Sequence, residues 1–390
     1  MTMTTSDSPT PGQVVIVGGG VAGLEALLAL QALAGDRVEL TLVSPHDWFV
    51  DRPVTVAEPF GLATAPRHSL PDIVAERGAR FVGATVVEVH ADAHRVSCAD
   101  GTELRFDKLI LAPGARLSAP GADAIAFGLE GSGQAIREML DRLRSGEARS
   151  VAFVAPGTAA WLLPLYELAL MTARELAHSN VEGVELRLLS PEARPLALFG
   201  DQGSQSVGRL LAAAGIEFIG STADPAAADY VVTLPLLRGP ELAGVPTTPP
   251  DGFVPVDEHG QVRGLADVYA AGDGVDFPIK QGGLAAQQAD AVAEHIAASY
   301  GAPVDPMPFR PVLRGMLFTG EAPLYMRSDA PGGDPDVPGA WYPLWWPPTK
   351  IAGRYLPPYL LERGAEEGLR KPPAGFVDVD IPLAGMTLPG

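Results

Sequence analysis

Three glycines near the amino terminus have the spacing of a dinucleotide-binding turn. Gly18, Gly20 and Gly23 form a GxGxxG pattern directly after the β-forming run at residues 14–17, and an apolar helix is predicted to follow. Gly18 would make the tight turn, Gly20 would let the backbone approach a pyrophosphate, and Gly23 would let the helix pack on the strand. The amino terminus of that helix would offer free N–H groups and partial positive charge to the phosphates.

The second predicted strand, residues 38–44, should end in an acid that binds the ribose hydroxyls, about 20 residues after the glycines. It ends in Ser44 instead. A serine hydroxyl can hydrogen-bond one ribose hydroxyl, whereas a carboxylate binds two. We therefore expect a weaker ribose contact at an otherwise intact site.

Two later segments also place glycines at the ends of predicted strands. Residues 106–121 give a buried strand that ends in Ala-Pro-Gly. Residues 264–296 give a strand, the pair Gly272 and Asp273, a loop, and a helix that starts near Gly283. A turn of this kind lets the backbone approach a bound nucleotide closely.

In this order, the three segments resemble the flavin motifs of the two-dinucleotide-domain flavoproteins. That family includes sulfide:quinone oxidoreductases, type II NADH dehydrogenases, flavocytochrome c sulfide dehydrogenases and ferredoxin reductases. The resemblance covers roughly residues 12–365 and implies an α/β protein with two Rossmann-like domains of the glutathione-reductase type. It implies FAD, bound non-covalently, as the cofactor. The implied parts are an FAD domain at 12–118 and 245–305, an inserted domain at 119–244 and a C-terminal cap at 306–390.

The resemblance also implies roles for single residues. Asp273 would hydrogen-bond the ribityl chain, and the helix that starts at Gly283 would point its amino terminus at the flavin edge where negative charge accumulates on reduction. Arg52 would lie near the adenosine or pyrophosphate, and the backbone of Val86 would meet adenine. The predicted cofactor-binding residues are Gly18, Gly20, Val21, Ala22, Gly23, Ser44, Arg52, Val86, Ala112, Pro113, Gly114, Gly272, Asp273, Gln281, Gly282, Gly283 and Leu284.

The inserted domain has the strand, turn and helix of a second nucleotide site, but its turn lacks the glycines. Residues 152–173 read AFVAPGTAAWLLPLYELALMTA, where the NADH-binding relatives have GGGxxGxE. Pro156 has no N–H, and Trp161 adds an indole where phosphates would pass. The next strand ends in Ser190, without a carboxylate at the ribose position. We expect a retained scaffold with a filled pocket, and the alternative is a non-standard NAD(P)H site.

Three charged residues are candidate catalytic groups. Glu167 resembles a glutamate that lines the substrate side of the flavin in sulfide:quinone oxidoreductases, and its other interpretation is structural. Lys350, in the aromatic segment 341–364, matches a lysine near flavin and quinone in the quinone-linked relatives, where a cation would stabilise a developing quinol anion. Lys280 would either reach the flavin or cap its own loop.

The single cysteine excludes several chemistries. Cys98 alone cannot form a dithiol relay or the paired redox cysteines of sulfide oxidases, so we predict their fold without sulfide chemistry. The histidines show no HExxH or comparable ligand spacing, and no GxSxG elbow is present. We therefore predict neither a metal site nor serine-hydrolase chemistry.

Composition bears on partners and location. A net charge of −19 argues against binding to nucleic acid. Residues 306–390 are nearly neutral and hold three of the five tryptophans, which indicates either a packed cap or an apolar surface for a quinone or a membrane face. No apolar run reaches about 18 residues, and residues 1–13 lack the pattern of a signal peptide. We predict a cytoplasmic protein, at most peripheral to a membrane.

The functional prediction is an FAD-dependent oxidoreductase that takes electrons from a small-molecule donor, with a quinone as the candidate acceptor. The first alternative is an NAD(P)H-dependent flavin, quinone or ferredoxin-type reductase. The second is a flavin-carrying subunit of a complex without enzymatic activity of its own.

Overall fold

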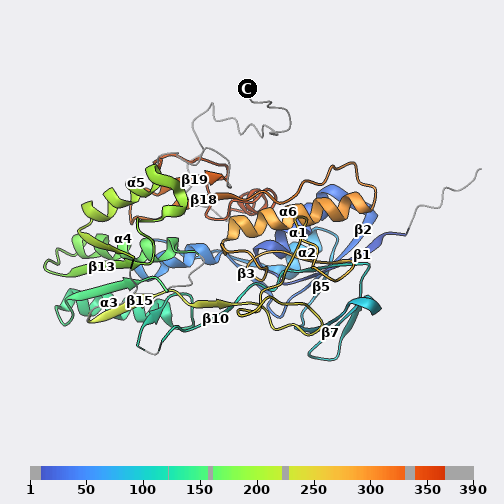
Figure 1. Ribbon diagram of the computed structural model, residues 1–390, viewed down its shortest axis with the longest axis horizontal. Coiled ribbons are helices and arrows are strands. Elements are labelled where there is room, and N and C mark those ends of the chain that lie inside the picture. The colour runs from blue at the N-terminus through green and yellow to red at the C-terminus, as the bar shows by residue number, and fades with distance from the viewer. Residues whose placement is uncertain (1–9, 122, 157–160, 222–227, 330–338, 365–390) are drawn as a thin grey trace, which may run out of the picture.

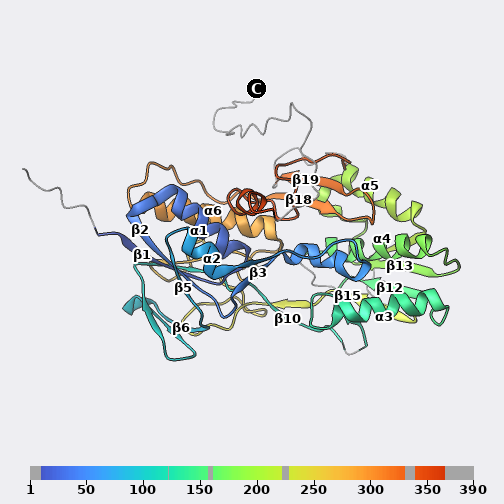
Figure 2. The same ribbon diagram turned by 180° about the vertical axis from the view of Figure 1, so that it is seen from behind.

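The computed structural model describes residues 10–121, 123–156, 161–221, 228–329 and 339–364 of the 390-residue chain. The molecule is elongated, and two α/β parts follow one another along its long axis (Figures 1 and 2). One part contains the beginning of the chain and the long helix α6, and the other contains the middle of the chain.

The first part is built on a sheet of five strands whose neighbours are all parallel. In spatial order the strands are β17 (Val268–Ala270), β9 (Lys108–Leu111), β1 (Gly12–Val17), β2 (Val38–Val43) and β5 (Arg80–Val82). Side chains alternate between the two faces of a strand. Val14 and Ile16 of β1 accordingly belong to one apolar cluster, and Val15 and Val17 belong to another.

Both faces of this sheet are covered, as a parallel sheet requires. The helices on one face are α1 (Val21–Ala34), α2 (Leu70–Glu76) and α6 (Gly282–Ser299). The small antiparallel sheet on the other face consists of β6 (Val86–His90), β7 (Arg95–Cys98) and β8 (Glu103–Arg105). Helix α1 is buried on almost every side because it packs between the sheet, α6 and α7 (Leu356–Leu361).

The second part repeats the arrangement with another parallel five-stranded sheet. Its strands in spatial order are β11 (Ile125–Ala126), β15 (Tyr230–Thr233), β12 (Ser150–Val154), β13 (Glu185–Ser190) and β14 (Ile216–Gly220). Its helices are α3 (Ser132–Ser145), α4 (Leu163–His178) and α5 (Gly200–Ala213). The predicted α/β fold with two Rossmann-like units is confirmed.

The second sheet interrupts the first in sequence, because all its strands lie between β9 and β17. The chain leaves the first part through β10 (Arg116–Ser118) and returns to it through β16 (Leu236–Arg238). These two strands pair antiparallel. The predicted domain boundaries stay predictions.

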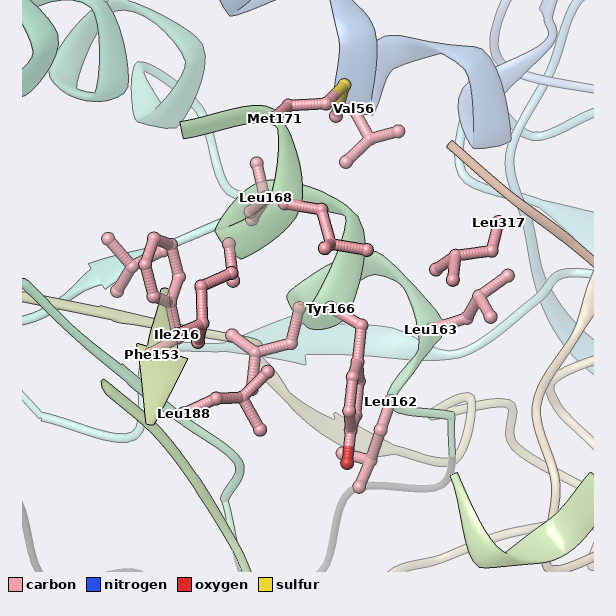
Figure 3. Packing of buried hydrophobic residues seen from close by; sticks show 14 of the residues in the cluster. Val56, Phe153, Leu162, Leu163, Tyr166, Leu168, Met171, Leu188, Ile216 and Leu317 are labelled. Carbon is pink, nitrogen blue, oxygen red and sulfur yellow. The ribbon is translucent and has the colours of Figure 1, made fainter. Parts of the chain in front are cut away.

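Two segments join the parts. The 3-10 helix η2 (Arg52–Phe60) leaves the first part through the β3 (Trp48–Val50) and β4 (Arg67–Ser69) pair, and its Val56 lies in the core of the second part. Figure 3 shows Val56 beside Met171 of α4. The sequence patterns did not predict that η2 would contribute to this core.

The C-terminal segment is the second connection. Its hairpin, β18 (Val312–Leu317) and β19 (Leu324–Asp329), packs on the second part through Leu317, which lies near Leu163 in Figure 3. Helix α7 packs on α1 of the first part. The region predicted as a cap therefore contacts both parts.

Among the described helices, none combines the length and the apolar character needed to cross a bilayer.

Candidate functional site

The three glycines of the first turn have different surroundings at the carboxyl end of β1. Gly18 has a φ of 112°, and a Cβ atom on it would lie 2.1 Å from the carbonyl oxygen of Ala112. A Cβ on Gly23 would lie 1.8 Å from the carbonyl oxygen of Gly18. A Cβ on Gly20 would meet no atom within 4 Å. Gly18 and Gly23 are thus required by the packing of the chain itself, whereas Gly20 borders open space.

That open space lies at the amino terminus of α1. Gly20 is exposed and Val21 is partly exposed, and no side chain caps the helix. The N–H groups of a first helical turn need partners from outside the helix. An exposed and uncapped helix start next to an open glycine fits the pyrophosphate of a dinucleotide.

The other two glycine segments meet the first turn. A Cβ on Gly272 would lie 3.0 Å from the Cβ of Ala22. A Cβ on Gly274 would lie 3.1 Å from the carbonyl oxygen of Gly114. Pro113 lies in the sequence between Ala112, which Gly18 approaches, and Gly114, and it is exposed. All three predicted flavin motifs therefore lie at one edge of the first sheet, which is the position in which they could hold one FAD molecule.

Ser44 follows β2 at the same edge and is buried. Its hydroxyl donates to the His46 carbonyl oxygen at 3.0 Å and accepts from the His46 N–H at 3.2 Å. A Cβ on Gly19 would lie 3.2 Å from this hydroxyl. The serine therefore stands beside the glycine turn, and its hydroxyl stabilises its own loop.

Val86 begins β6 and is buried in the apolar cluster on the sheet face opposite the helices. Its side chain is part of the core, and the contact of its backbone with adenine stays a prediction.

Asp273 is half-buried after β17. Burial raises the pKa of its carboxyl group, and the positive charges of Lys280 and Arg52 oppose that shift. Lys280 donates to the Val275 carbonyl oxygen, and its ammonium lies 3.7 Å from the centre of the Phe253 ring. Burial lowers the pKa of Lys280 to about 8. These contacts are those of a cap of its own loop, and a contact of Lys280 with the flavin stays a prediction.

The start of α6 is capped by Gln281. The side-chain oxygen of Gln281 accepts the Leu284 N–H at 2.9 Å, and its amide donates to the Arg314 carbonyl oxygen at 3.0 Å. The glutamine therefore takes one of the N–H groups that the sequence assigned to the flavin, and it ties α6 to β18.

The C-terminal segment covers the same helix start. A Cβ on Gly282 would lie 3.4 Å from the Cγ1 atom of Ile351. A Cβ on Gly283 would lie 3.3 Å from the carbonyl oxygen of Ala352. These two glycines permit a close approach of the residues that directly follow Lys350.

Glu167 and Lys350, selected separately from the sequence, form a buried ion pair. Glu167 is fully buried, and Lys350 donates to its Oε1 atom. The Phe318 N–H also donates to Oε1 at 2.8 Å, and the lysine ammonium lies 4.1 Å from the centre of the Phe318 ring. Burial raises the pKa of Glu167 and lowers the pKa of Lys350, and the charge of each opposes the shift of the other. The pair links α4 to the C-terminal segment.

Replacing Lys350 by methionine should lower the free energy of unfolding by about 3–5 kcal/mol, because Glu167 would stay buried without its cation. Denaturant unfolding measures this. Adding Glu167→Gln should recover much of the loss. Lys108→Met is the matched control, since Lys108 and Asp267 form a partly exposed pair expected to contribute about 1 kcal/mol or less. Equal effects of the two lysine variants would contradict the importance of the buried pair.

The aromatic residues before Lys350 divide into buried and exposed ones. Trp345 is buried against Tyr325, with ring centres 5.2 Å apart, and its indole N–H donates to the Thr349 carbonyl oxygen at 3.0 Å. Trp341 and Tyr342 are exposed. Trp345 therefore belongs to a packed cap, and a contact of the exposed Trp341 and Tyr342 with a quinone or a membrane face stays a prediction.

Glu25 was missed by the sequence reasoning. It is fully buried in α1 and accepts the N–H groups of Arg354, Tyr355 and Leu356 at 2.6–2.7 Å. Burial raises its pKa and that of the neighbouring Asp290. The available signal was a glutamate among apolar residues of a helix predicted to pack on the sheet. It fixes the C-terminal segment next to the first turn.

The second turn is partly outside the described residues, because Gly157, Thr158, Ala159 and Ala160 are not among them. Trp161 follows them, and its ring packs edge-on against Phe199, with ring centres 5.9 Å apart. The indole is therefore partly buried and packs against the apolar core of the second part.

The position where a ribose would bind the second sheet is occupied by an internal network. Ser190, at the end of β13, is fully buried. Glu192 accepts the Ala197 N–H at 3.0 Å and hydrogen bonds from the hydroxyls of Tyr166 and Ser190 at 3.3 and 3.4 Å. Burial raises the pKa of Glu192. Glu192, two residues after the end of this strand, is thus engaged by its own loop and by Tyr166 of α4.

Comparison with known proteins gives matches in sequence and in fold. The family described as pyridine nucleotide-disulphide oxidoreductase matches residues 12–227. Rhodocoxin reductase from Rhodococcus erythropolis is 36% identical over 124 residues, which is 28% of this chain and 27% of that relative. The match therefore spans less than a third of the curated relative.

Solved structures extend the likeness over most of the chain. The sulfide:quinone oxidoreductase of Aquifex aeolicus has a TM-score of 0.71 at 21% identity, covering 82% of this chain and 84% of that one. Putidaredoxin reductase, in its covalent complex with putidaredoxin, has a TM-score of 0.59 at 23% identity, covering 83% and 82%. At these identities the likeness is one of fold.

Proposed function

The chain belongs to the pyridine nucleotide-disulphide oxidoreductase family, a family of FAD-binding flavoproteins, and from this premise we propose an oxidoreductase whose electron donor is a small molecule other than NAD(P)H. FAD is its cofactor, which agrees with the prediction from the three glycine motifs. When bound, FAD supplies the two-electron chemistry that transfers electrons between a donor and an acceptor.

The residues of the chain would hold this cofactor along one edge of the first sheet. The open space beside Gly20 would receive the pyrophosphate, and Asp273 would accept hydrogen bonds from the ribityl hydroxyls. Burial raises the pKa of Asp273, and the positive charges of Lys280 and Arg52 oppose that rise and so favour its carboxylate form.

Replacing Asp273 by alanine should weaken FAD binding by about 1.5–3 kcal/mol, because a charge-assisted hydrogen bond is lost. This corresponds to a rise in the FAD dissociation constant of about 10-fold to 150-fold. Asp276→Ala is the matched control, because Asp276 is an exposed aspartate in the same loop. Flavin content after dialysis and fluorescence titration with FAD measure the effect, and equal affinity in the two variants would contradict the role of Asp273.

The buried ion pair of Glu167 and Lys350 supports a quinone as the acceptor. Lys350 precedes Ile351, which covers the start of α6, so its charge lies close to the predicted flavin site. A two-electron reduction places negative charge on a quinone oxygen, and a fixed cation stabilises such charge without reorganisation. Glu167 would hold the ammonium in place.

An anaerobic donor panel tests the proposal. The flavin absorbance of the purified protein is followed with small-molecule reductants, and then with a water-soluble quinone added to the reduced protein. We expect at least one donor to bleach the flavin and the quinone to restore it. If the added quinone does not reoxidise the reduced flavin, the assigned acceptor is wrong.

A ferredoxin-type reductase is the second candidate. It is favoured by the sequence match to rhodocoxin reductase, although that match covers 28% of the chain. NAD(P)H-driven electron transfer to a small iron–sulfur protein would support it over the quinone proposal.

A further inference from the structure

A short stretch of the C-terminal segment lies beside the predicted FAD site, and we define residues 349–356 as the strap. A Cβ on Gly282 would lie 3.4 Å from Cγ1 of Ile351 and 3.9 Å from Cγ2 of Val21. Val21 begins α1 and Gly282 begins α6, so Ile351 of the strap covers the place where the two helix starts meet. The pyrophosphate and the flavin edge are predicted to bind at these two helix starts.

Buried carboxylates fasten the strap on both sides. The pair of Glu167 and Lys350 holds its beginning on the second part of the molecule. Glu25 of α1 holds its end, because it accepts the three consecutive backbone N–H groups of residues 354–356 at 2.6–2.7 Å. Its Oε1 atom accepts two of them and its Oε2 atom accepts the third. Hydrogen bonds to a carboxylate are stronger than those between neutral groups, so Glu25 stabilises the closed position of the strap.

Gly353 allows the strap to approach this carboxylate closely. A Cβ on Gly353 would lie 2.8 Å from Oε2 of Glu25 and 2.9 Å from Cδ of Pro357. Glu25 itself lies two residues after Gly23 of the first glycine turn. The end of the strap is therefore held directly against the helix whose start would bind the pyrophosphate.

The other side of the strap is packed less well. A cavity of about 10 Å³ lies between Asp51 and His68 on one side and Thr349, Ile351 and Leu356 of the strap on the other. Oδ1 of Asp51 and Nε2 of His68 are buried and have no hydrogen-bond partner among the described residues. Buried polar atoms without partners are costly, and lifting the strap lets solvent reach both of them. This side of the strap therefore favours opening, which the hydrogen bonds to Glu25 oppose.

We propose that the strap is a gate for FAD and that Glu25 is the positioning residue that keeps it closed. FAD enters and leaves its site only while the strap is lifted, and Glu25 sets how often this local opening occurs. Glu25 acts through the strap and does not contact the cofactor. The inference rests on the FAD site proposed above and needs neither the quinone nor a particular donor.

A gate has a kinetic signature that a cofactor-binding residue lacks. A weaker fastening destabilises the closed strap by the same free energy in the free and in the FAD-bound protein. FAD then enters and leaves faster by the same factor, and its dissociation constant stays the same. Loss of a contact with FAD itself, as in Asp273→Ala, raises the dissociation constant instead.

Glu25→Gln tests the gate in the purified holoprotein. The glutamine keeps the shape of the carboxylate, but its NH2 group cannot accept a hydrogen bond from a backbone N–H. Release of bound FAD, measured by exchange against excess radiolabelled FAD, should be at least about tenfold faster, the factor for one charge-assisted hydrogen bond. The dissociation constant from fluorescence titration should stay within about threefold of the wild-type value. Hydrogen exchange of the amides of residues 354–356 should be accelerated by the same factor as FAD release.

Two variants serve as controls. Glu294→Gln removes a carboxylate that pairs with the Arg354 side chain at 2.8 Å but does not hold the strap backbone. Leu104→Ala removes a buried side chain on the opposite face of the first sheet and lowers stability without touching the strap. Both variants should release FAD at the wild-type rate. Gly353→Ala is a second test, because it displaces the strap from Glu25 and should also accelerate release if Glu25→Gln does not fold.

Wild-type rates of FAD release in Glu25→Gln and Gly353→Ala would overturn the gate. A dissociation constant that rises together with the release rate would also overturn it, and so would equal acceleration in Leu104→Ala. A protein that binds no FAD would overturn the gate together with its site. Failure of the quinone assay alone contradicts only the assigned acceptor.

Discussion

Replacing Gly20 by valine should yield a folded protein that retains almost no FAD. A Cβ on Gly20 meets no protein atom within 4 Å, so the substitution creates no clash within the chain. Its side chain would instead fill the space at the start of α1 where the pyrophosphate binds. The loss of two phosphate contacts at about 1.4 kcal/mol each raises the dissociation constant about a hundredfold. Flavin absorbance of the purified variant measures the loss.

Two other glycines serve as controls for this variant. Gly121 also borders open space and lies outside the predicted site, so Gly121→Val should keep its FAD. Gly23→Val should fail to fold, because its Cβ would lie 1.8 Å from the Gly18 carbonyl oxygen. Circular dichroism distinguishes a folded variant that has lost FAD from a variant that does not fold. A yellow Gly20→Val protein with the wild-type FAD content would show that the pyrophosphate lies elsewhere.

NADH and NADPH should bind the protein at least about a hundredfold more weakly than they bind a glycine-rich turn. Trp161 is packed into the core beside Phe199, and Glu192 is engaged by Tyr166 and the Ala197 N–H. Two missing contacts, one with the phosphates and one with the ribose, at about 1.4 kcal/mol each account for the hundredfold weaker binding. Equilibrium titration with either nucleotide, followed calorimetrically, measures it. Binding at micromolar concentration would contradict the filled pocket.

The first glycine turn could be predicted from sequence because its requirements are local. Gly18 is required by the close approach of Ala112, which follows the neighbouring strand, and Gly23 by the carbonyl oxygen of Gly18, whereas Gly20 borders open space. The same holds for the alternation of Val14 to Val17, which follows from a strand covered on both faces. The spacing of these residues in the sequence is therefore enough to predict the strand and the turn.

The contacts between distant segments could not be predicted in this way. Glu167 and Lys350 are 183 residues apart, and each was selected without knowledge of the other. Glu25 accepts N–H groups more than 300 residues away. Such pairs depend on how the C-terminal segment packs against both parts of the molecule, and no local pattern encodes that packing.

The cavity beside Asp51 shows the same limit. Asp51 and His68 are adjacent only because β3 and β4 pair in one register. The C-terminal segment then closes the cavity from the other side. A sequence pattern indicates that both residues are polar, but only the packing shows that two of their atoms are buried without partners.

Anaerobic stopped-flow mixing with NADH or NADPH tests most directly whether the second dinucleotide site is inactive. Hydride transfer requires the nicotinamide to be held in a reactive geometry, so weak binding should lower the rate as well as the affinity. With nucleotide at millimolar concentration we expect the oxidised flavin absorbance to persist for far longer than about a second, the time of an ordinary enzymatic turnover. Saturable bleaching within about a second, with half-saturation at micromolar nucleotide, would contradict the account and identify an NAD(P)H-dependent reductase.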